Sequence, residues 1–253
     1  MKALKSITFI LLTIMVNLGT QAQSTTAEKP TIVFVHGIWA DGSSFNAQTA
    51  ALQAKGYHVV SIQNPITSLA EDVATTQRAL DLIKGKVILV GHSWGGFVIS
   101  QVGNDPKVVG MVYLAAYAPE LGETVLTVSA NAGPTELTKY FAESGGYVYI
   151  TEEGVKNVFA NDLTSKQQGL IYATQTPAFH TVFNDKSGTP AWKIKPTWYI
   201  VSKGDKTINP DLERFMAKRM KAKTIEIESS HVVMNSRPQD VLKVIEEAAN
   251  YKY

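Results

Sequence analysis

The sequence predicts an α/β fold, with a mostly parallel central sheet and helices on both of its faces. Short apolar runs rich in valine and isoleucine recur along the chain, and amphipathic segments separate them. The chain is 45% hydrophobic and 18% charged, as is typical of a globular protein. Without a leader, about 230 residues remain, which is enough for one domain with a large core.

Six strands and five helices follow from the hydrophobic periodicity. The expected strands are short apolar runs that end at turns, and the expected helices carry apolar residues three and four positions apart. The strands cover residues 31–36, 57–62, 86–91, 108–115, 196–202 and 223–228, and the helices cover residues 44–55, 68–83, 94–104, 210–220 and 238–250.

The regular alternation stops between residues 119 and 195. This segment contains Gly145-Gly146, scattered helical patches and several aromatic residues. We interpret it as a helical cap inserted over a site, within one domain that covers residues 23–253. A cap excludes water and shapes a pocket, which favours small or medium substrates over polymers.

The first 22 residues have the pattern of a secretory signal peptide. A basic start with Lys2 and Lys5 precedes a largely apolar stretch from Ile7 to Leu18, and Ala22 offers a cleavage site. The apolar stretch is short for a membrane span, so we expect export to the periplasm or the medium without a stable membrane anchor. Cleavage leaves 22 basic and 22 acidic residues, a balance that gives no electrostatic case for binding nucleic acid.

The segment Gly91-His92-Ser93-Trp94-Gly95-Gly96 has the pattern of a nucleophile elbow. An apolar run that ends at Val90 precedes it, and a helix can follow it. Small residues at Gly91 and Gly95 allow the sharp turn that exposes a serine hydroxyl. Ser93 is therefore the predicted nucleophile. The chain has no cysteine, so a thiol nucleophile and disulfides are excluded.

A serine nucleophile needs a histidine base that a carboxylate orients. His231 follows the strand expected at 223–228, at the strand end where α/β proteins assemble their sites, and the other four histidines are less suitably placed. Asp205 follows the strand expected at 196–202, and Glu120 is the alternative acid. The order Ser93, Asp205, His231 is that of an α/β hydrolase. The amides of Ile38, after the strand at 31–36, and of Trp94 are the expected oxyanion hole.

These motifs resemble the α/β-hydrolase superfamily, in the branch of small capped esterases that includes plant methyl salicylate esterases and hydroxynitrile lyases. The matching segments are His36-Gly37-Ile38-Trp39, Gly42-Ser43-Ser44-Phe45, the elbow, Val201 to Asp205, and Ser230 to Met234. In the cyanohydrin lyases of this branch a lysine follows the catalytic histidine. Here that residue is Val232, so the resemblance favours a hydrolase over a lyase.

The sequence thus predicts a serine hydrolase that cleaves a small or medium carboxylic ester, without a metal or cofactor, because no metal-ligand cluster or phosphate-binding loop is present. A lactone, amide or carbon–carbon bond hydrolase, a perhydrolase, a cofactor-free oxygenase and a non-catalytic binding protein remain alternatives. Candidates for the pocket wall are the aromatic residues Trp39, Trp94, Tyr117, Phe179, His180 and Trp192.

Overall fold

A computed structural model describes residues 29–253 of the chain. The predicted signal peptide at residues 1–22 lies outside the described residues. Within 29–253, none of the helices has the length and the hydropathy that crossing a membrane requires.

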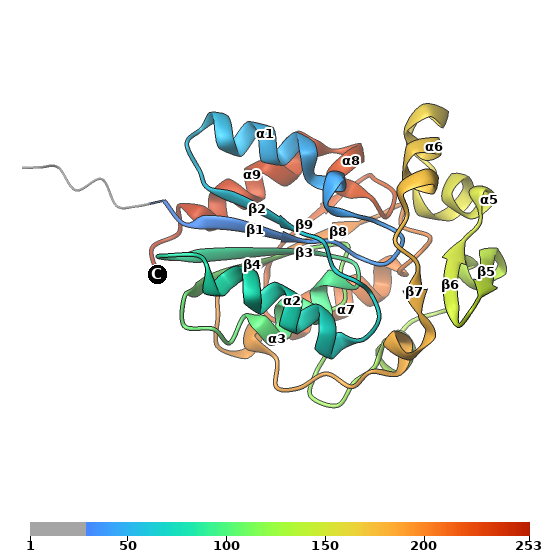
Figure 1. The fold of residues 1–253 in the computed structure, drawn as a ribbon, viewed down its shortest axis with the longest axis horizontal. Coiled ribbons are helices and arrows are strands. Elements are labelled where there is room, and N and C mark those ends of the chain that lie inside the picture. Colours follow the sequence, from blue (N-terminus) through green and yellow to red (C-terminus); the bar gives the residue numbers. More distant parts are fainter. Residues whose placement is uncertain (1–28) are drawn as a thin grey trace, which may run out of the picture.

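Six parallel strands form the central sheet in the order β2-β1-β3-β4-β8-β9, which confirms the predicted fold class (Figure 1). The strands are β1 (Thr31–Val35), β2 (Val59–Ile62), β3 (Val87–His92), β4 (Val108–Leu114), β8 (Thr197–Ser202) and β9 (Lys223–Ile227). Every residue of β1, β3 and β8 is buried, because helices cover both faces of a parallel sheet. The carboxyl ends of these strands therefore meet at one edge of the sheet.

The helices pack in two layers, with α1 and α9 on one face of the sheet and α2, α3 and α7 on the other (Figure 1). Their bounds are α1 (Asn46–Ala54), α2 (Leu69–Asp81), α3 (Gly95–Val102), α7 (Pro210–Arg219) and α9 (Pro238–Ala249). Each lies within its predicted range. The 3₁₀ turn Gly42–Phe45 and the short helix α8 (Val233–Ser236) are additional.

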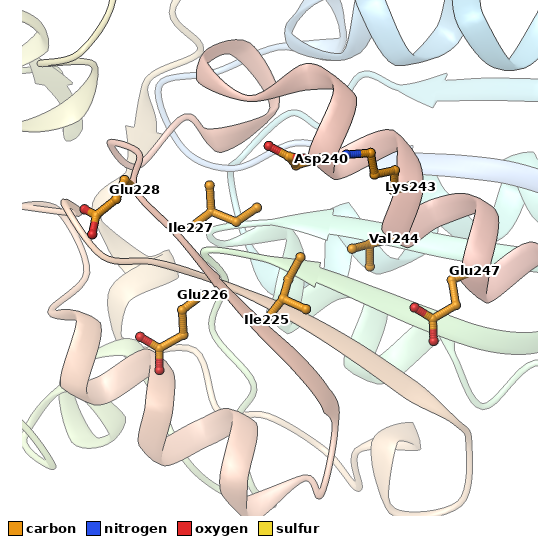
Figure 2. Close-up of a pocket in the computed structure, with 8 residues that line it drawn as sticks. All are labelled: Ile225, Glu226, Ile227, Glu228, Asp240, Lys243, Val244 and Glu247. Carbon is orange, nitrogen blue, oxygen red and sulfur yellow. Dashed lines mark hydrogen bonds and ion pairs between the residues drawn. The ribbon is translucent and has the colours of Figure 1, made fainter.

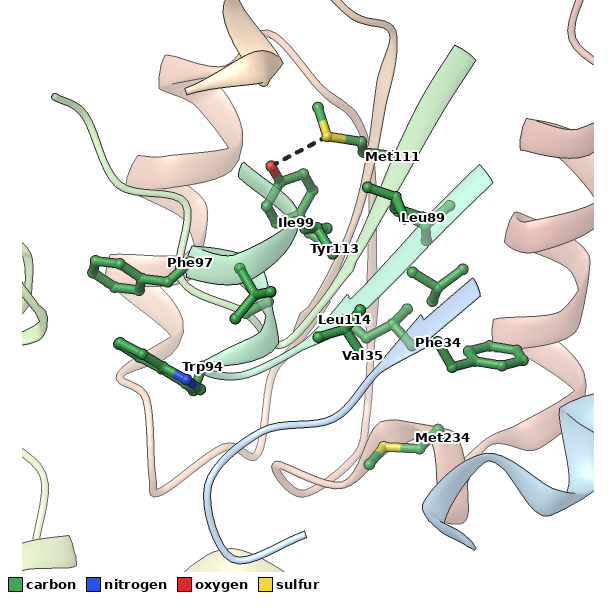
Figure 3. Packing of buried hydrophobic residues seen from close by; sticks show 14 of the residues in the cluster. Phe34, Val35, Leu89, Trp94, Phe97, Ile99, Met111, Tyr113, Leu114 and Met234 are labelled. Atoms are coloured by element: carbon green, nitrogen blue, oxygen red, sulfur yellow. Dashed lines mark hydrogen bonds between the residues drawn. The ribbon is translucent and has the colours of Figure 1, made fainter. Parts of the chain in front are cut away.

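Side chains of the inner strands fill the core on both sides of the sheet (Figure 3). Phe34 stacks on Phe45 with ring centroids 4.5 Å apart, and the Tyr113 hydroxyl lies 2.9 Å from Ser100 Oγ of α3. Burial of each large apolar side chain stabilises the fold by about 1.5–3 kcal/mol. The ends of β3 and β8 are thereby held on a rigid base.

The segment between β4 and β8 differs from the helical cap that we predicted, because it also contains a three-stranded antiparallel sheet, β5-β6-β7. Its elements are α4 (Val125–Ser129), β5 (Phe141–Ser144), β6 (Tyr147–Ile150), α5 (Glu152–Gly154), α6 (Ser165–Thr174) and β7 (Ala178–Phe179), with a π-helical turn at Val155–Phe159 and 3₁₀ turns at Leu137–Tyr140, His180–Asn184 and Ala191–Lys193. Gly145 and Gly146 have φ values of +57° and +82° and form the two-residue turn between β5 and β6. Two glycines at such a turn are a hairpin signal that our helical interpretation overlooked.

Candidate active site

Ser93 lies on a sharp turn between β3 and α3. Its φ of +53° is in the left-handed region, where a side chain is strained. The neighbouring glycines leave the space for this turn, since a Cβ on Gly95 would lie 2.2 Å from the Val35 carbonyl oxygen and one on Gly91 would lie 2.8 Å from the Gly95 carbonyl oxygen. The strand, strained serine and helix that the motif predicts are thus present.

His231 and Asp205 meet across the ends of β9 and β8. His231 Nδ1 lies 2.5 Å from Asp205 Oδ2, and both side chains are fully buried. Asp205 Oδ1 accepts hydrogen bonds from the Thr207 amide at 2.6 Å and from the Ile208 amide at 3.0 Å. A proton on Nδ1 leaves Nε2 as the basic nitrogen, and Nε2 is buried with no hydrogen-bond partner in residues 29–253.

His92 joins the serine turn to the His231 loop. Its Nε2 donates to the His231 carbonyl oxygen at 3.0 Å, and the two imidazole rings are 4.6 Å apart. Burial holds the pKa of His92 well below its usual range, so this ring is neutral. Because His92 directly precedes Ser93, this hydrogen bond fixes the two candidate catalytic segments next to each other, a contact that we did not predict.

The backbone after β1 approaches Ser93 closely. A Cβ on Gly37 would lie 2.5 Å from Ser93 Cβ, so only glycine fits there. His36 holds this loop, since its Nε2 accepts from the Asn64 amide at 3.0 Å and its Nδ1 donates to the Gly37 carbonyl oxygen at 2.9 Å. The amides of Ile38, which follows Gly37, and of Trp94, which follows Ser93, donate to no acceptor among the described residues. An oxyanion hole needs such free donors, and its assignment to these two amides stays a prediction.

The Trp94 indole points away from the site, contrary to our expectation that it lines the pocket. Its Nε1 donates to Asp72 Oδ2 at 2.7 Å, and its ring stacks on Phe97 at 4.9 Å (Figure 3). Asp72 also accepts from the Ile66 amide at 2.9 Å. Burial raises the pKa of the Asp72 carboxyl to about 6. Sequence reasoning missed this anchor of the residue after the nucleophile.

A wall of aromatic rings connects the site with the cap. Phe159, in the π-helical turn, lies 5.1 Å from the His231 ring and 6.1 Å from the Trp39 ring. Trp39 also contacts Phe141 of β5 at 5.3 Å and donates from Nε1 to the Val148 carbonyl oxygen of β6 at 2.9 Å. Trp39 therefore joins the loop after β1 to the cap, and its place in the pocket wall stays a prediction. The contact of Phe159 with His231 was not predicted. Ser93 is 6% exposed and His231 0%, so the site lies under this cover.

Phe179 and His180 lie on the cap sheet and pack with each other rather than toward the triad. Their rings are 4.5 Å apart, and Phe179 contacts Tyr147 at 5.2 Å. His180 is exposed, and its Nδ1 lies 3.1 Å from the Gly146 carbonyl oxygen. No ring contact or hydrogen bond between described residues joins either side chain to Ser93 or His231, and their place in the pocket wall stays a prediction.

Trp192 and Glu120 also take other partners. Trp192 donates to the Pro119 carbonyl oxygen at 3.0 Å and lies 5.9 Å from the Arg219 guanidinium, on the α3 and α7 side of the sheet. Glu120 pairs with Lys193 at 2.6 Å, so Asp205 is the acid that reaches His231. Tyr117 is nearer the site, because its amide donates to the Ser93 carbonyl oxygen at 3.1 Å, but its hydroxyl points to Ser129 Oγ.

A separate groove runs between β9 and α9 on the edge of the sheet (Figure 2). It is lined by Ile225, Glu226, Ile227, Glu228, Asp240, Lys243, Val244 and Glu247. No serine or histidine is among these eight residues, so the groove is distinct from the Ser93 site.

The chain matches a known protein family over most of its length. Residues 32–244, from β1 into α9, match the model of the alpha/beta hydrolase family. The chain belongs to the alpha/beta hydrolase family. This confirms the resemblance that the elbow and the strand-end residues indicated.

This alpha/beta hydrolase has relatives that are named as esterases and hydrolases. It is 32% identical over 129 residues to a carbendazim hydrolyzing esterase from Nocardioides sp. (strain SG-4G), and the match spans 46% of this chain and only about half, 52%, of that esterase. It is 26% identical over 247 residues to a pyrethroid hydrolase from Sphingobium wenxiniae, with 87% of each chain covered.

Among solved structures, an extracellular alpha/beta-hydrolase from a Paenibacillus species superposes with a TM-score of 0.76 at 20% identity, covering 88% of this chain and 100% of that one. That protein is described as sharing structural and functional homology with tobacco salicylic acid binding protein 2. This likeness confirms the fold. The alpha/beta hydrolase is therefore an enzyme whose esterase-named relatives support carboxylic ester hydrolysis at the level of the family.

Proposed function

We propose that this enzyme is a serine hydrolase that cleaves carboxylic esters through an acyl-enzyme on Ser93. The observation that carries the proposal is the buried hydrogen bond between His231 and Asp205, next to a serine held on a strained turn. Such an arrangement supplies a nucleophile, a base and a carboxylate that orients the base. The unpartnered Nε2 of His231 is the atom that takes the serine proton.

The reaction has two steps. In the first, His231 Nε2 takes the proton of Ser93 Oγ while this oxygen attacks the acyl carbon, and the amides of Ile38 and Trp94 stabilise the oxyanion. The intermediate collapses, and the alcohol leaves with the proton from His231. In the second step, His231 removes a proton from water while the water oxygen attacks the acyl carbon. The bond between the acyl carbon and Ser93 Oγ then breaks, His231 returns the proton to Oγ, and the acid departs. Asp205 stabilises the imidazolium in both steps.

The aromatic wall supports an ester with an apolar, ring-containing part. Trp39, Phe141 and Phe159 form a connected set of rings that reaches His231. Aromatic walls favour apolar and aromatic groups, since these bury area without leaving polar atoms unpaired. The relatives named for carbendazim and pyrethroid hydrolysis support a small-molecule substrate.

Turnover of a panel of p-nitrophenyl esters tests the proposal. We expect measurable kcat/KM on one or more members of a series with increasing acyl length and with a phenyl acyl group. Ser93→Ala should remove this activity, whereas Ser165→Ala, at an exposed serine of the cap, should retain it. If Ser93→Ala retains more than a small fraction of the activity, Ser93 is not the nucleophile.

We also propose that the enzyme is exported. The basic start with Lys2 and Lys5, the apolar stretch from Ile7 to Leu18 and the small residue Ala22 support this. Cell fractionation and N-terminal sequencing of the recovered protein test it. A mature chain in the periplasm or medium that begins at Gln23 is expected, and full-length protein retained in the cytoplasm would contradict it.

A further inference from the structure

Glu213 is a fully buried acid beneath the triad, and the proposed reaction does not use it. It lies on α7, and its side chain is 0% exposed. Its Oε2 accepts a hydrogen bond from the Ser202 amide at 3.0 Å. Ser202 is the last residue of β8, and its carbonyl oxygen accepts from the Asp205 amide at 3.1 Å. Glu213 is thus bonded to the strand end that carries Asp205.

Burial raises the pKa of Glu213 well above its usual range, and the charge of Asp205 and a hydrogen bond between the two side chains raise this pKa further. Two buried carboxyl groups joined by a hydrogen bond cannot both be ionised, so one of them holds a proton. Three N–H donors, from Thr207, Ile208 and His231, favour the ionised form of Asp205, whereas Glu213 accepts from one amide. The proton therefore belongs to Glu213.

One further atom agrees with this assignment. Glu213 Oε1 is buried, and no donor in the described part of the chain reaches it. A bare buried carboxylate oxygen would be costly, but an O–H group that donates to Asp205 is satisfied. The other ionisable neighbours do not reverse this, since Arg214 is only a weak counter-charge and burial raises the pKa of Tyr117 and Tyr199, which leaves both hydroxyls neutral.

We propose that Glu213 is a positioning residue of the triad, which holds its proton at neutral pH and donates it in a hydrogen bond to Asp205 while accepting from the Ser202 amide. Asp205 then has four donors, which fix its orientation toward His231 and moderate its strength as an acceptor. In this form a glutamic acid does what a glutamine side chain would do. The inference rests on the proposed triad, but its structural test does not require activity.

The variants Glu213→Gln and Glu213→Leu separate this role from simple packing. Glutamine retains one donor and one acceptor, so we expect kcat within about twofold of wild type. Leucine fills similar space without the donor, so we expect kcat to fall about tenfold or more. In Glu213→Leu, Asp205 becomes a stronger acceptor from His231, so the acidic limb of kcat/KM should move to higher pH, and in Glu213→Gln it should not. Glu153→Gln, at an exposed glutamate of α5, is the matched control and should behave as wild type.

Thermal unfolding as a function of pH tests the proton on Glu213 without any substrate. Burial and the charge of Asp205 raise the pKa of Glu213 well above its usual value of 4.5. The stability that its neutral form contributes is complete below about pH 4.5 and declines as the pH rises toward the raised pKa. Glu213→Gln removes this decline, so its Tm should exceed that of wild type by a few degrees at pH 8, and the two should converge near pH 4.5.

Three results would overturn the inference. Glu213→Gln could lose as much activity as Glu213→Leu, which would mean that the negative charge is needed. Glu213→Leu could keep wild-type kcat and pH profile, or the Tm difference of Glu213→Gln could be independent of pH. If neither wild type nor variant hydrolyses any ester, the proposed function fails, and the unfolding data still decide on Glu213. If Glu213→Leu does not fold, Glu213→Gln and the unfolding data decide.

Discussion

The sheet and the cap of this enzyme differ in how directly local sequence determines what each residue contacts. In the sheet, Ser93, Asp205 and His231 each follow a strand, and the parallel arrangement brings those strand ends together. In the cap, Phe159 contacts His231, but Phe179 contacts Tyr147 and His180. A strand end has a defined place in a parallel sheet, whereas an aromatic residue in irregular chain can pack toward the site or away from it.

This contrast implies that the chemistry depends on the sheet and the substrate preference on the cap. Substitutions at strand ends should therefore change kcat, and substitutions of cap residues that contact the triad, such as Phe159, should change KM. Substitutions of cap residues without such a contact should change neither kcat nor KM.

Asp205→Asn should have the largest effect. Asparagine retains the shape but cannot stabilise the imidazolium, and its amide can force the wrong His231 tautomer. We expect kcat to fall by about 10⁴-fold, with KM within a few-fold. Steady-state kinetics on the best ester measure this, and Glu120→Gln is the control with unchanged kcat. Nearly normal kcat in Asp205→Asn would remove Asp205 from the triad.

Asp72→Asn should change the pH dependence of stability. The pKa of Asp72 is raised from 3.8 to about 6 by burial, so its stabilising contribution is complete below pH 3.8 and is lost as the pH rises through about 6. The free energy of unfolding of wild type relative to Asp72→Asn should thus fall by on the order of 2 kcal/mol between pH 4 and 7. Urea denaturation at several pH values measures this. If this difference in the free energy of unfolding is the same at every pH, the pKa of Asp72 is not raised in the folded protein.

Phe159→Leu should change substrate binding more than chemistry. The smaller side chain gives up the ring contacts with His231 and Trp39, so we expect KM for a phenyl ester to rise by about threefold to tenfold while kcat stays within about threefold. Phe179→Leu replaces the same residue type on β7, where the ring packs against Tyr147 and His180, and should leave KM unchanged. Equal effects of the two substitutions would show that the contact of Phe159 with His231 does not set the substrate preference.

His180→Ala should have the smallest effect. The ring is exposed and lies beside Phe179 and Gly146. We expect kcat and KM within about twofold of wild type, because exposed substitutions of this kind are usually within 0.5 kcal/mol. A tenfold loss in kcat/KM on any ester would show that this part of the cap reaches the substrate.

The sequence sufficed for the sheet and for the residues at its strand ends, because hydrophobic period, turn glycines and strand-end position are local signals. It did not reveal the hydrogen-bonded partners beneath them. Asp72 and Glu213 lie on helices whose charged residues are expected on the surface, and their burial depends on which turn faces the sheet. The acceptors of Trp94 and Trp192 were hidden for a related reason, since a buried indole donates to whichever acceptor the fold brings to it, here the Asp72 carboxyl and the Pro119 carbonyl.

Covalent trapping of Ser93 tests the central claim most directly. Purified enzyme is treated with a fluorophosphonate, the intact mass is measured, and a peptide digest locates the adduct, with Ser93→Ala treated in parallel. The account predicts one adduct per chain on Ser93 in wild type and none in Ser93→Ala. An adduct on another serine, or an unmodified wild-type enzyme that still hydrolyses esters, would contradict it.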